Sequence, residues 1–465
     1  MKAHERRGFL KMACAAGVGA ALGPRLTRGQ APDGRAKPNI IFILADDLSS
    51  HSIGAYGGRL YRTAPPGQPE PLAETPVRTP NLDRMAREGA RFDYVLSAPV
   101  CSPTRGMFLT GKYNFRIGLP DITGRGGAVK ELDVVNNVTL PQLLRKHGYL
   151  TAMAGKWHLS STGGPKMSPT IEDNPREHIA KAGFERQFQH ENGLAFHNYI
   201  DKETGGFEAD WIQNWVMKFL DGQGGSQRPF FLYYPMPMPH SPWGPNPKTG
   251  EKYKDAGHNG IAYFGDTVEY LDGYVGQVLD KLEELGLAEN TLVLFSGDNG
   301  SEGPFTVMED GSYTRGGKFG FGQNARVPLI ARWPGTIRPG TVRDDLVDTT
   351  DFLPTLLEVA GVEPPAGGID GVSFRDALLG KTGSPRDWML SFWMGKYIVR
   401  DRRYGLREDG KLYDLTATSN FRDGVIEEAA MTPEVRGARD RFREVVAKYA
   451  LPVGEAMPQK EENER

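Results

Sequence analysis

The chain has 465 residues, of which 39% are hydrophobic and 25% are charged, and its formal net charge is -2. This composition is typical of a globular protein with a large core, and it excludes a strongly basic surface of the kind that binds nucleic acid or membranes. Only two cysteines are present, Cys14 and Cys101, so a disulfide framework is excluded as well. Any site for an anion must therefore be built from a local cluster of positive charge.

The first segment has the features of an export signal. Residues 1–31 combine a basic start with an apolar run of small residues at 12–23, which is too short to span a bilayer but suits the core of a signal peptide. The stretch ERRGFLK at 5–11 resembles the bacterial twin-arginine motif. We therefore expect a twin-arginine-type signal peptide at 1–31, export by the twin-arginine machinery, a periplasmic or secreted mature protein, and no stable membrane anchor.

Between residue 37 and about residue 380, short apolar runs alternate with amphipathic helix patterns. The run NIIFILA at 39–45 predicts a strand buried on both faces, and TLVLFSG at 291–297 predicts another. Thr79 and Pro80 are typical of a helix start, with a stop at Gly89. This alternation predicts an α/β fold with a large, mostly parallel central sheet flanked by helices, and we assign it to one domain at 37–380.

A second long helix is expected before the second of these strands. Asp266 and Glu269 have the spacing of a capping box, which predicts that the helix begins there. Apolar residues then recur at helical spacing from Val268 to Leu282, and Gly286 ends the pattern.

The sequence changes character after about residue 380. Residues 388–415 alternate aromatic and β-branched side chains with glycine-containing turns, which predicts a smaller antiparallel sheet. We assign this sheet to a C-terminal subdomain at 381–454. The charged, apolar-poor residues 455–465 are expected to form a flexible tail.

Each of the two buried strands runs into acidic residues. Asp46 and Asp47 follow the first strand, and Asp298 and Asn299 follow the second. In open α/β sheets ligands bind beyond the carboxyl ends of the strands, so the two clusters are expected to face one crevice. Three carboxylates and an amide oxygen favour a hard cation such as calcium or magnesium over zinc. The alternative interpretation of each cluster taken singly is a helix cap or a tight turn.

Cys101 alone would be interpreted as a small buried hydrophobe. However, Cys101-x-Pro103-x-Arg105, followed by LTGK at 109–112, resembles the signature of the type I sulfatases of the alkaline phosphatase superfamily. In that family the cysteine is oxidised after translation to Cα-formylglycine by a maturation enzyme that reads the motif. The resemblance extends over roughly residues 37–420 and includes GKWHL at 155–159, PHSP at 239–242 and SGDNG at 296–300.

The resemblance implies a role for each matching residue. Asp46, Asp47, Asp298 and Asn299 match the ligands of the divalent metal, and the modified Cys101 completes the metal's shell. Further catalytic and substrate-binding positions are matched by Arg105, which holds the formylglycine hydroxyl, by Lys156 and His158, which contact the substrate, and by His240 and Lys318, which lie near the ester oxygen.

The implied reaction is the hydrolysis of a sulfate ester on a saccharide or an aryl alcohol. Its cofactors would be Ca²⁺, with Mg²⁺ possible, and formylglycine derived from Cys101. In the family, one hydroxyl of the hydrated aldehyde attacks sulfur, and the second hydroxyl allows the sulfate to be expelled afterwards. Positive charge from the metal, Arg105, Lys156 and Lys318 would offset the negative charge of the sulfate oxygens.

Two other functions are compatible with the sequence. Phosphonate monoester and phosphodiester hydrolases of the same superfamily share the fold, the metal and formylglycine, although Asn299 mildly favours a sulfatase. A non-catalytic protein that binds sulfated glycans would leave Cys101 unmodified. The metal set and the paired lysine and histidine contacts count against that function, because binding alone requires no metal-held nucleophile.

Overall fold

The computed structural model describes most of the chain from residue 37 onward. The described residues are 37–60, 78–123, 131–160, 175–188, 207–241, 243, 263–302, 304–307, 313–315, 318, 320–321, 325–381, 383, 386–416 and 424–454. The expected signal peptide and the expected C-terminal tail lie outside these residues.

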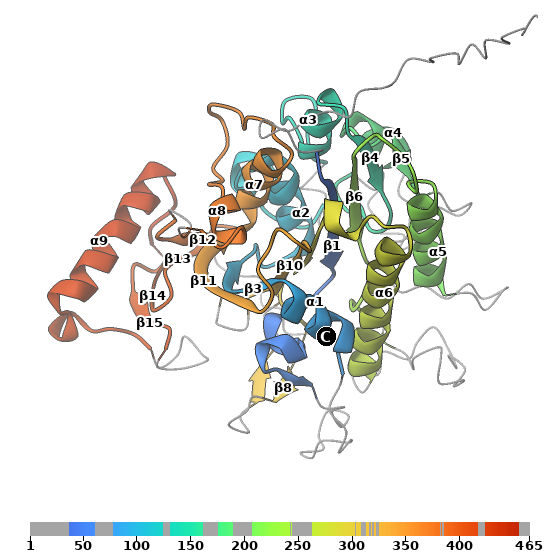
Figure 1. The fold of residues 1–465 in the computed structure, drawn as a ribbon. Coiled ribbons are helices and arrows are strands. Elements are labelled where there is room, and N and C mark those ends of the chain that lie inside the picture. Colours follow the sequence, from blue (N-terminus) through green and yellow to red (C-terminus); the bar gives the residue numbers. More distant parts are fainter. Residues whose placement is uncertain are drawn as a thin grey trace, which may run out of the picture.

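An eight-stranded sheet forms the centre of the molecule, in the order β11-β3-β10-β7-β1-β6-β4-β5 (Figure 1). Its strands are β1 Asn39–Ala45, β3 Ala90–Leu96, β4 Leu150–Met153, β5 Arg186–Gln187, β6 Phe230–Pro235, β7 Thr291–Gly297, β10 Leu329–Arg332 and β11 Thr341–Asp348. Both predicted buried strands are confirmed, and they pair in parallel as β1 and β7 with Asn39 opposite Thr291.

The central sheet is mostly parallel. β10 alone among these eight strands runs opposite to its neighbours, pairing antiparallel with both β3 and β7. All other pairings in the sheet are parallel. The carboxyl ends of the seven parallel strands therefore lie at one edge, and the predicted fold class is confirmed.

Helices cover both faces of the central sheet, because alternate side chains of a strand point to opposite faces. The α-helices of the described residues are α1 Pro80–Glu88, α2 Cys101–Thr110, α3 Leu140–Lys146, α4 Pro175–Lys181, α5 Glu208–Asp221, α6 Phe264–Glu284, α7 Phe352–Val359, α8 Arg375–Leu378 and α9 Pro433–Lys448. Phe42 of β1 packs into the core that α2, α3, α7 and α8 share. Its neighbours Ile41 and Ile43 pack on the other face, where α1, α5 and α6 lie (Figure 1).

The predicted start of the long helix was wrong. α6 begins at Phe264, so Asp266 lies inside its first turn and does not cap it. The apolar stripe is correct, because Val268, Leu271 and Leu282 are fully buried. The position of α1 is confirmed, although the Thr79 hydroxyl bonds to Asp83 and does not cap the helix.

A second, antiparallel sheet follows the central one in the chain. Its strands pair in the order β12-β13-β14-β15, with bounds β12 Met389–Trp393, β13 Lys396–Arg400, β14 Tyr404–Arg407 and β15 Leu412–Asp414. This confirms the antiparallel sheet expected there. The helix α9 was not expected in this region; it packs against the sheet (Figure 1), with Phe442 and Val445 in the shared apolar core.

A third, small sheet consists of β2 Arg59–Leu60, β8 Pro304–Val307 and β9 Tyr313–Arg315, with antiparallel pairing throughout. Within the parts of the chain described above, no helix combines the length and the apolar character that a membrane span needs.

Candidate active site

The topology brings five chain segments together at the carboxyl edge of the central sheet. Asp46 and Asp47 follow β1, and Asp298 and Asn299 follow β7, which lies beside it. Cys101 comes a few residues after β3 and begins α2. The segments after β4 and β6 carry the basic candidates, Lys156 with His158 and His240 respectively.

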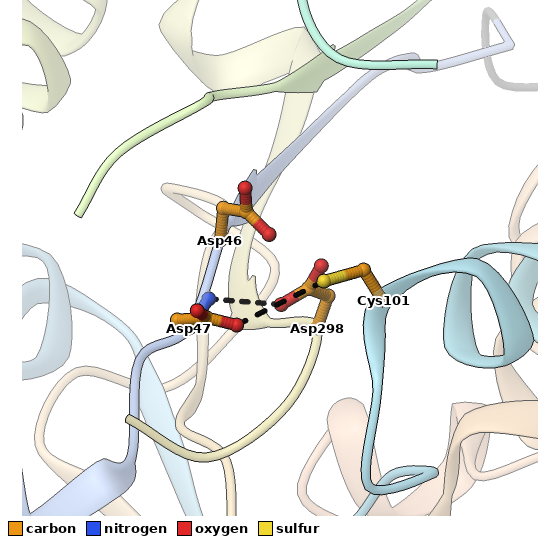
Figure 2. A group of neighbouring side chains, drawn as sticks. All are labelled: Asp46, Asp47, Cys101 and Asp298. Carbon is orange, nitrogen blue, oxygen red and sulfur yellow. Dashed lines mark hydrogen bonds between the residues drawn. The ribbon is translucent and has the colours of Figure 1, made fainter. Parts of the chain in front are cut away.

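The three aspartates and Cys101 form one buried cluster (Figure 2). One ligand atom from each of the four residues lies within 4.8 Å of the others, and all four residues are buried. The backbone N–H of Asp47 donates to Asp298 Oδ1 at 3.0 Å, and Cys101 Sγ lies 3.8 Å from Asp47 Oδ1. Asp47 adopts a left-handed backbone with φ of 63°, which turns the chain sharply after β1. The predicted metal-ligand residues are therefore close together in space.

The chemistry of the cluster fits a hard divalent cation. Asn299 is fully buried, and its Nδ2 donates to Asp47 Oδ1 at 2.5 Å and to the carbonyl of Gly300 at 3.0 Å. None of the described residues donates a hydrogen bond to Asn299 Oδ1. A buried amide oxygen that accepts no hydrogen bond is costly, and it is the kind of ligand that calcium or magnesium binds.

Arg105 forms hydrogen bonds to two of the carboxylates, those of Asp46 and Asp298. It lies one turn after Cys101 on α2, so both side chains project from the same face of the helix. Its Nη2 donates to Asp298 Oδ2 at 2.6 Å and to Asp46 Oδ1 at 3.2 Å, and its Nη1 donates to the carbonyl of Lys156 at 2.8 Å. All of these side chains are fully buried. Arg105 thus compensates a negative charge that the interior could not otherwise hold.

Lys156 supplies the second buried cation of the site. Its Nζ donates to Asp46 Oδ2 at 2.6 Å. Burial alone would raise the pKa of Asp46, but the charges of Lys156 and other neighbouring cations hold that pKa well below its usual range. Gly155, with φ of 124°, lets the chain just before Lys156 pass close to the end of β6, since a Cβ there would lie 2.0 Å from the carbonyl oxygen of Pro235.

Cys101 is a protonated thiol in this environment. Its side chain is buried, and burial together with the three surrounding carboxylates raises the pKa of the thiol well above its usual range, although Lys156 opposes this. Because the thiolate is the reactive form of cysteine, an unmodified Cys101 is a poor nucleophile at neutral pH.

His240 and Lys318 lie together on the opposite side of Asp47. Lys318 Nζ donates to Asp47 Oδ2 at 2.5 Å and lies 3.2 Å from His240 Nε2. His240 Nδ1 lies 2.6 Å from the carbonyl of Ser241 and therefore carries the hydrogen of the neutral ring. Burial, reinforced by the positive charge of Lys318, lowers the pKa of His240 to about 4, so its Nε2 is an acceptor at neutral pH.

His158 lies two residues after Lys156 and adopts a left-handed backbone with φ of 55°. Its side chain is buried, and its carbonyl accepts a hydrogen bond from the Thr123 hydroxyl at 3.3 Å. Thr123 in turn donates its backbone N–H to the hydroxyl of Ser102, next to Cys101. His158 is thus held beside the start of α2 by a short chain of contacts.

Sequence reasoning missed Glu302. This carboxylate forms an ion pair with Lys318, and the ligand atoms of Glu302, His240 and Asp47 lie within 4.8 Å of one another. The sequence feature that could have indicated Glu302 is its position three residues after Asn299, which places it at the same edge of the sheet. A glutamate in a loop is usually solvated, and this spacing alone does not indicate its lysine partner.

The family model described as Sulfatase matches residues 38–362. The chain belongs to the sulfatase family. A second model, described as N-sulphoglucosamine sulphohydrolase, C-terminal, matches residues 313–421 of this sulfatase. By family, the protein is a sulfuric ester hydrolase that acts on sulfate esters.

Curated relatives cover most of the sulfatase. The N-acetylgalactosamine-6-sulfatase of Canis lupus familiaris is 31% identical over 84% of this chain and 73% of its own length. Arylsulfatase A of Bos taurus is 31% identical over 79% of this chain and 74% of its own length.

Solved structures share the fold of the sulfatase. A protein in complex with its substrate D-glucosamine-2-N,6-O-disulfate matches with a TM-score of 0.67 and 21% identity, over 89% of this chain and 98% of that chain. The PsFucS1 sulfatase from Pseudoalteromonas sp. matches with a TM-score of 0.61 and 22% identity, over 91% and 93% of the two chains.

Proposed function

We propose that the protein hydrolyses sulfate monoesters with a formylglycine made from Cys101 and a divalent cation held by Asp46, Asp47, Asp298 and Asn299. The observation that carries this proposal is the buried cluster of three carboxylates around Cys101, with Asn299 Oδ1 lacking a donor among the described residues. Calcium is the preferred cation and magnesium the alternative, because both bind oxygen ligands. When present, the cation and the hydrated aldehyde supply an activated hydroxyl for attack on sulfur.

The basic residues of the site stabilise the charge of the sulfate. A sulfate monoester repels an anionic nucleophile, and this charge must be offset in the transition state. Arg105 and Lys156 are fully buried and fixed by Asp46 and Asp298, so they offer oriented positive charge at no cost in rearrangement. We assign Arg105 to the hydroxyl of the modified Cys101, and Lys156 to the sulfate.

The leaving group is assigned to the other side of Asp47. The ammonium of Lys318 lies 3.2 Å from the acceptor nitrogen of His240. Because His240 is neutral at ordinary pH, Lys318 is the donor of this pair, and we assign it to the ester oxygen that departs. His158 is assigned to a substrate hydroxyl beside Lys156.

We assign the substrate to the sulfated saccharides. The relatives include an N-acetylgalactosamine-6-sulfatase, and two solved structures of the same fold hold a glucosamine disulfate and a neocarrahexaose. Residues 1–31 support export by the twin-arginine machinery to the periplasm or beyond. A maturation enzyme that recognises Cys101-x-Pro103-x-Arg105 completes the set of proposed partners.

Two measurements on protein from its own host test the proposal. A mass spectrum of the peptide holding Cys101 should show loss of the thiol and gain of an aldehyde. Matched assays with 4-nitrophenyl sulfate and bis(4-nitrophenyl) phosphate should show preferential turnover of the sulfate ester, and Cys101→Ser should abolish that turnover because serine lacks the second hydroxyl.

Other results would favour the competing functions. Faster turnover of the phosphodiester would replace the proposal with phosphodiester hydrolysis. An unmodified thiol in folded protein, combined with affinity for a sulfated glycan and no turnover, would identify a glycan-binding protein.

A further inference from the structure

We propose that Glu302 is a positioning residue that holds Lys318 against His240, so that the lysine ammonium faces the departing oxygen of the ester. This inference rests on the proposed function, because it concerns the donor to the leaving group. Glu302 follows β7 in the segment that also carries Asp298 and Asn299. It is about one-quarter exposed, whereas the side chain of Lys318 is 6% exposed.

Lys318 has three hydrogens, and three acceptors from the described residues lie around its Nζ. Asp47 Oδ2 lies at 2.5 Å, His240 Nε2 lies at 3.2 Å, and Glu302 Oε1 accepts a short hydrogen bond. An ammonium on a flexible four-carbon stem has no preferred direction of its own. The two carboxylates therefore fix its direction, and the third hydrogen, which His240 Nε2 accepts here, is the one that Lys318 would give to the ester oxygen.

The three acceptors are not equivalent. Asp47 also accepts from Asn299, and its oxygens belong to the carboxylate cluster that fits a cation. His240 offers one lone pair, on Nε2, because its Nδ1 faces the carbonyl of Ser241. Glu302 stands outside the cluster of Asp46, Asp47, Cys101 and Asp298 and carries a full negative charge toward Lys318. Of the two carboxylates that hold the lysine, it is the one outside that cluster.

Glu302 also connects the lysine to the segment after β6. The side chain of Ser241 stabilises the charge of Glu302, and the carbonyl of Ser241 accepts the Nδ1 hydrogen of His240. Glu302, Lys318, His240 and Ser241 thus form a closed ring of contacts on one side of Asp47. Loss of Glu302 would leave Lys318 free to turn toward Asp47 and away from the substrate.

The chemistry gives this role a specific signature. A 4-nitrophenolate leaves readily without a proton, whereas the alkoxide of a sugar needs one, so the donor contributes mainly to saccharide substrates. A variant that misplaces Lys318 should therefore lose activity selectively. A residue that only supports the fold would affect both substrates alike.

The test compares wild type, Glu302→Gln and Glu302→Asp on 4-nitrophenyl sulfate and on N-acetylgalactosamine 6-sulfate. For Glu302→Gln we expect kcat on the sugar sulfate to fall by roughly 10²-fold, with less than a tenfold change on the nitrophenyl ester and an unchanged KM. Glu302→Asp should restore part of the loss. Glu177→Gln, which removes a Glu–Lys pair on the exposed face of α4, is the matched control and should change nothing.

Equal losses on both substrates, or no loss on the sugar sulfate, would overturn the inference, provided that thermal unfolding shows a folded variant. Failure of the proposed function is distinguishable, because wild type would then cleave neither ester. In that case crystal structures of wild type and Glu302→Gln decide the inference. Movement of Lys318 Nζ away from His240 in the variant supports the positioning role, and an unmoved lysine refutes it.

Discussion

At the scale of single residues, Asp47 joins the two halves of the site. Its carboxylate contacts Cys101 and Asn299 on one side and Lys318 and His240 on the other. Burial raises the pKa of Asp47 to about 6, even though the charge of Lys318 opposes this effect. A change at Asp47 would therefore disturb the proposed cation site and the proposed donor together, which makes neighbouring residues better probes of each half.

Arg105 offers the cleaner probe of the carboxylate half. We expect Arg105→Lys to destabilise the fold by about 3 kcal/mol, because the single nitrogen of a lysine cannot occupy the separate positions of Nη1 and Nη2, so at least one buried acceptor among Asp46, Asp298 and the Lys156 carbonyl loses its donor. The loss of kcat/KM should be at least roughly 10²-fold. Urea unfolding and steady-state kinetics measure the two effects. Wild-type stability and activity in this variant would mean that the buried carboxylates do not need a forked donor.

At the scale of elements, α6 caps the start of α1. Asp272 accepts the backbone N–H groups of Asn81 and Leu82 at 3.1 and 2.8 Å, and it also accepts the Asn81 side chain at 2.8 Å. These backbone groups belong to the first turn of α1, where a helix leaves its N–H groups without internal partners. Gly276, one turn further along α6, makes room for this contact, since a Cβ there would lie 2.5 Å from Asn81 Oδ1.

Asp272→Ala should therefore lower the free energy of unfolding by about 2 kcal/mol, because several donors of α1 lose their acceptor in a buried place. Asp280→Ala is the control on the same helix. Asp280 also pairs with α1, through Arg84, but its side chain is 68% exposed, so we expect no measurable change. Similar losses in both variants would show that charge, and not capping, links the two helices.

Glu208, the first residue of α5, should make stability depend on pH. Burial raises the pKa of Glu208 to about 8 from an ordinary value near 4.5. A raised acid pKa means that the folded state keeps the proton longer than the unfolded chain. The stabilisation is therefore complete below about pH 4.5 and is lost as the pH rises through about 8.

Glu208→Gln should remove this dependence. As the pH rises from 5 to 8.5, the free energy of unfolding of the variant should increase by a few kcal/mol relative to that of wild type. A tenfold change in proton affinity is worth ~1.4 kcal/mol. Chemical denaturation at the two pH values measures the gain. Glu284→Gln, at a 65% exposed position of α6, should show none. A wild-type pH slope in Glu208→Gln would place the dependence elsewhere.

The helices and strands also show which sequence patterns predict an element correctly and which do not. β1 and β7 could be predicted because continuous apolar runs ending in aspartates are distinctive. The start of α6 could not, since Asp266 fits a cap by type while Phe264 begins the helix through packing that depends on tertiary contacts. α9 has an apolar stripe and Thr432 as its N-cap. It was not predicted, because the strand-like residues before it indicated a sheet for that region.

At the scale of the whole molecule, a buried ion pair joins the central sheet to the C-terminal sheet of β12–β15. Arg386, shortly before β12, donates to both oxygens of Asp351 at 2.7 and 2.5 Å. Asp348, at the end of β11, accepts the N–H of Leu390 in β12 and the hydroxyl of Tyr113, which follows α2. The helix that carries Cys101 is thus anchored at its far end to this junction.

Arg386→Ala should cost about 3–5 kcal/mol of unfolding free energy, because Asp351 would remain buried without its partner. Arg402→Ala is the matched control across the same two sheets. Arg402 pairs with Asp344 at the surface, where the two side chains are 49% and 73% exposed, and its removal should have little effect. Thermal and urea unfolding of the two variants measure the difference. An equally small loss in Arg386→Ala would show that the sheets are held by apolar packing alone.

More of the candidate site than of the surrounding fold could be predicted from the sequence. The positions of Asp46 and Asp298 can be predicted because each residue comes directly after a buried strand, and parallel strands end at the same edge of the sheet. Contacts between irregular segments do not follow in this way. The pairing of Glu302 with Lys318 and the left-handed backbone of Asp47 depend on chain directions that no periodic pattern encodes.

The burial of α2 has a consequence for the timing of synthesis. Every residue of this helix is buried, and Cys101 is covered by partners that include Asp298, about 200 residues later in the chain. At the ~5–20 residues per second of translation, those partners emerge ~10–40 seconds after Cys101. The proposed maturation enzyme would therefore have a window of this length on the growing chain, before β7 pairs with β1 and the thiol is buried. If the oxidation of Cys101 were slower than the elongation of the chain, the protein would fold with an unmodified thiol that the enzyme could no longer reach.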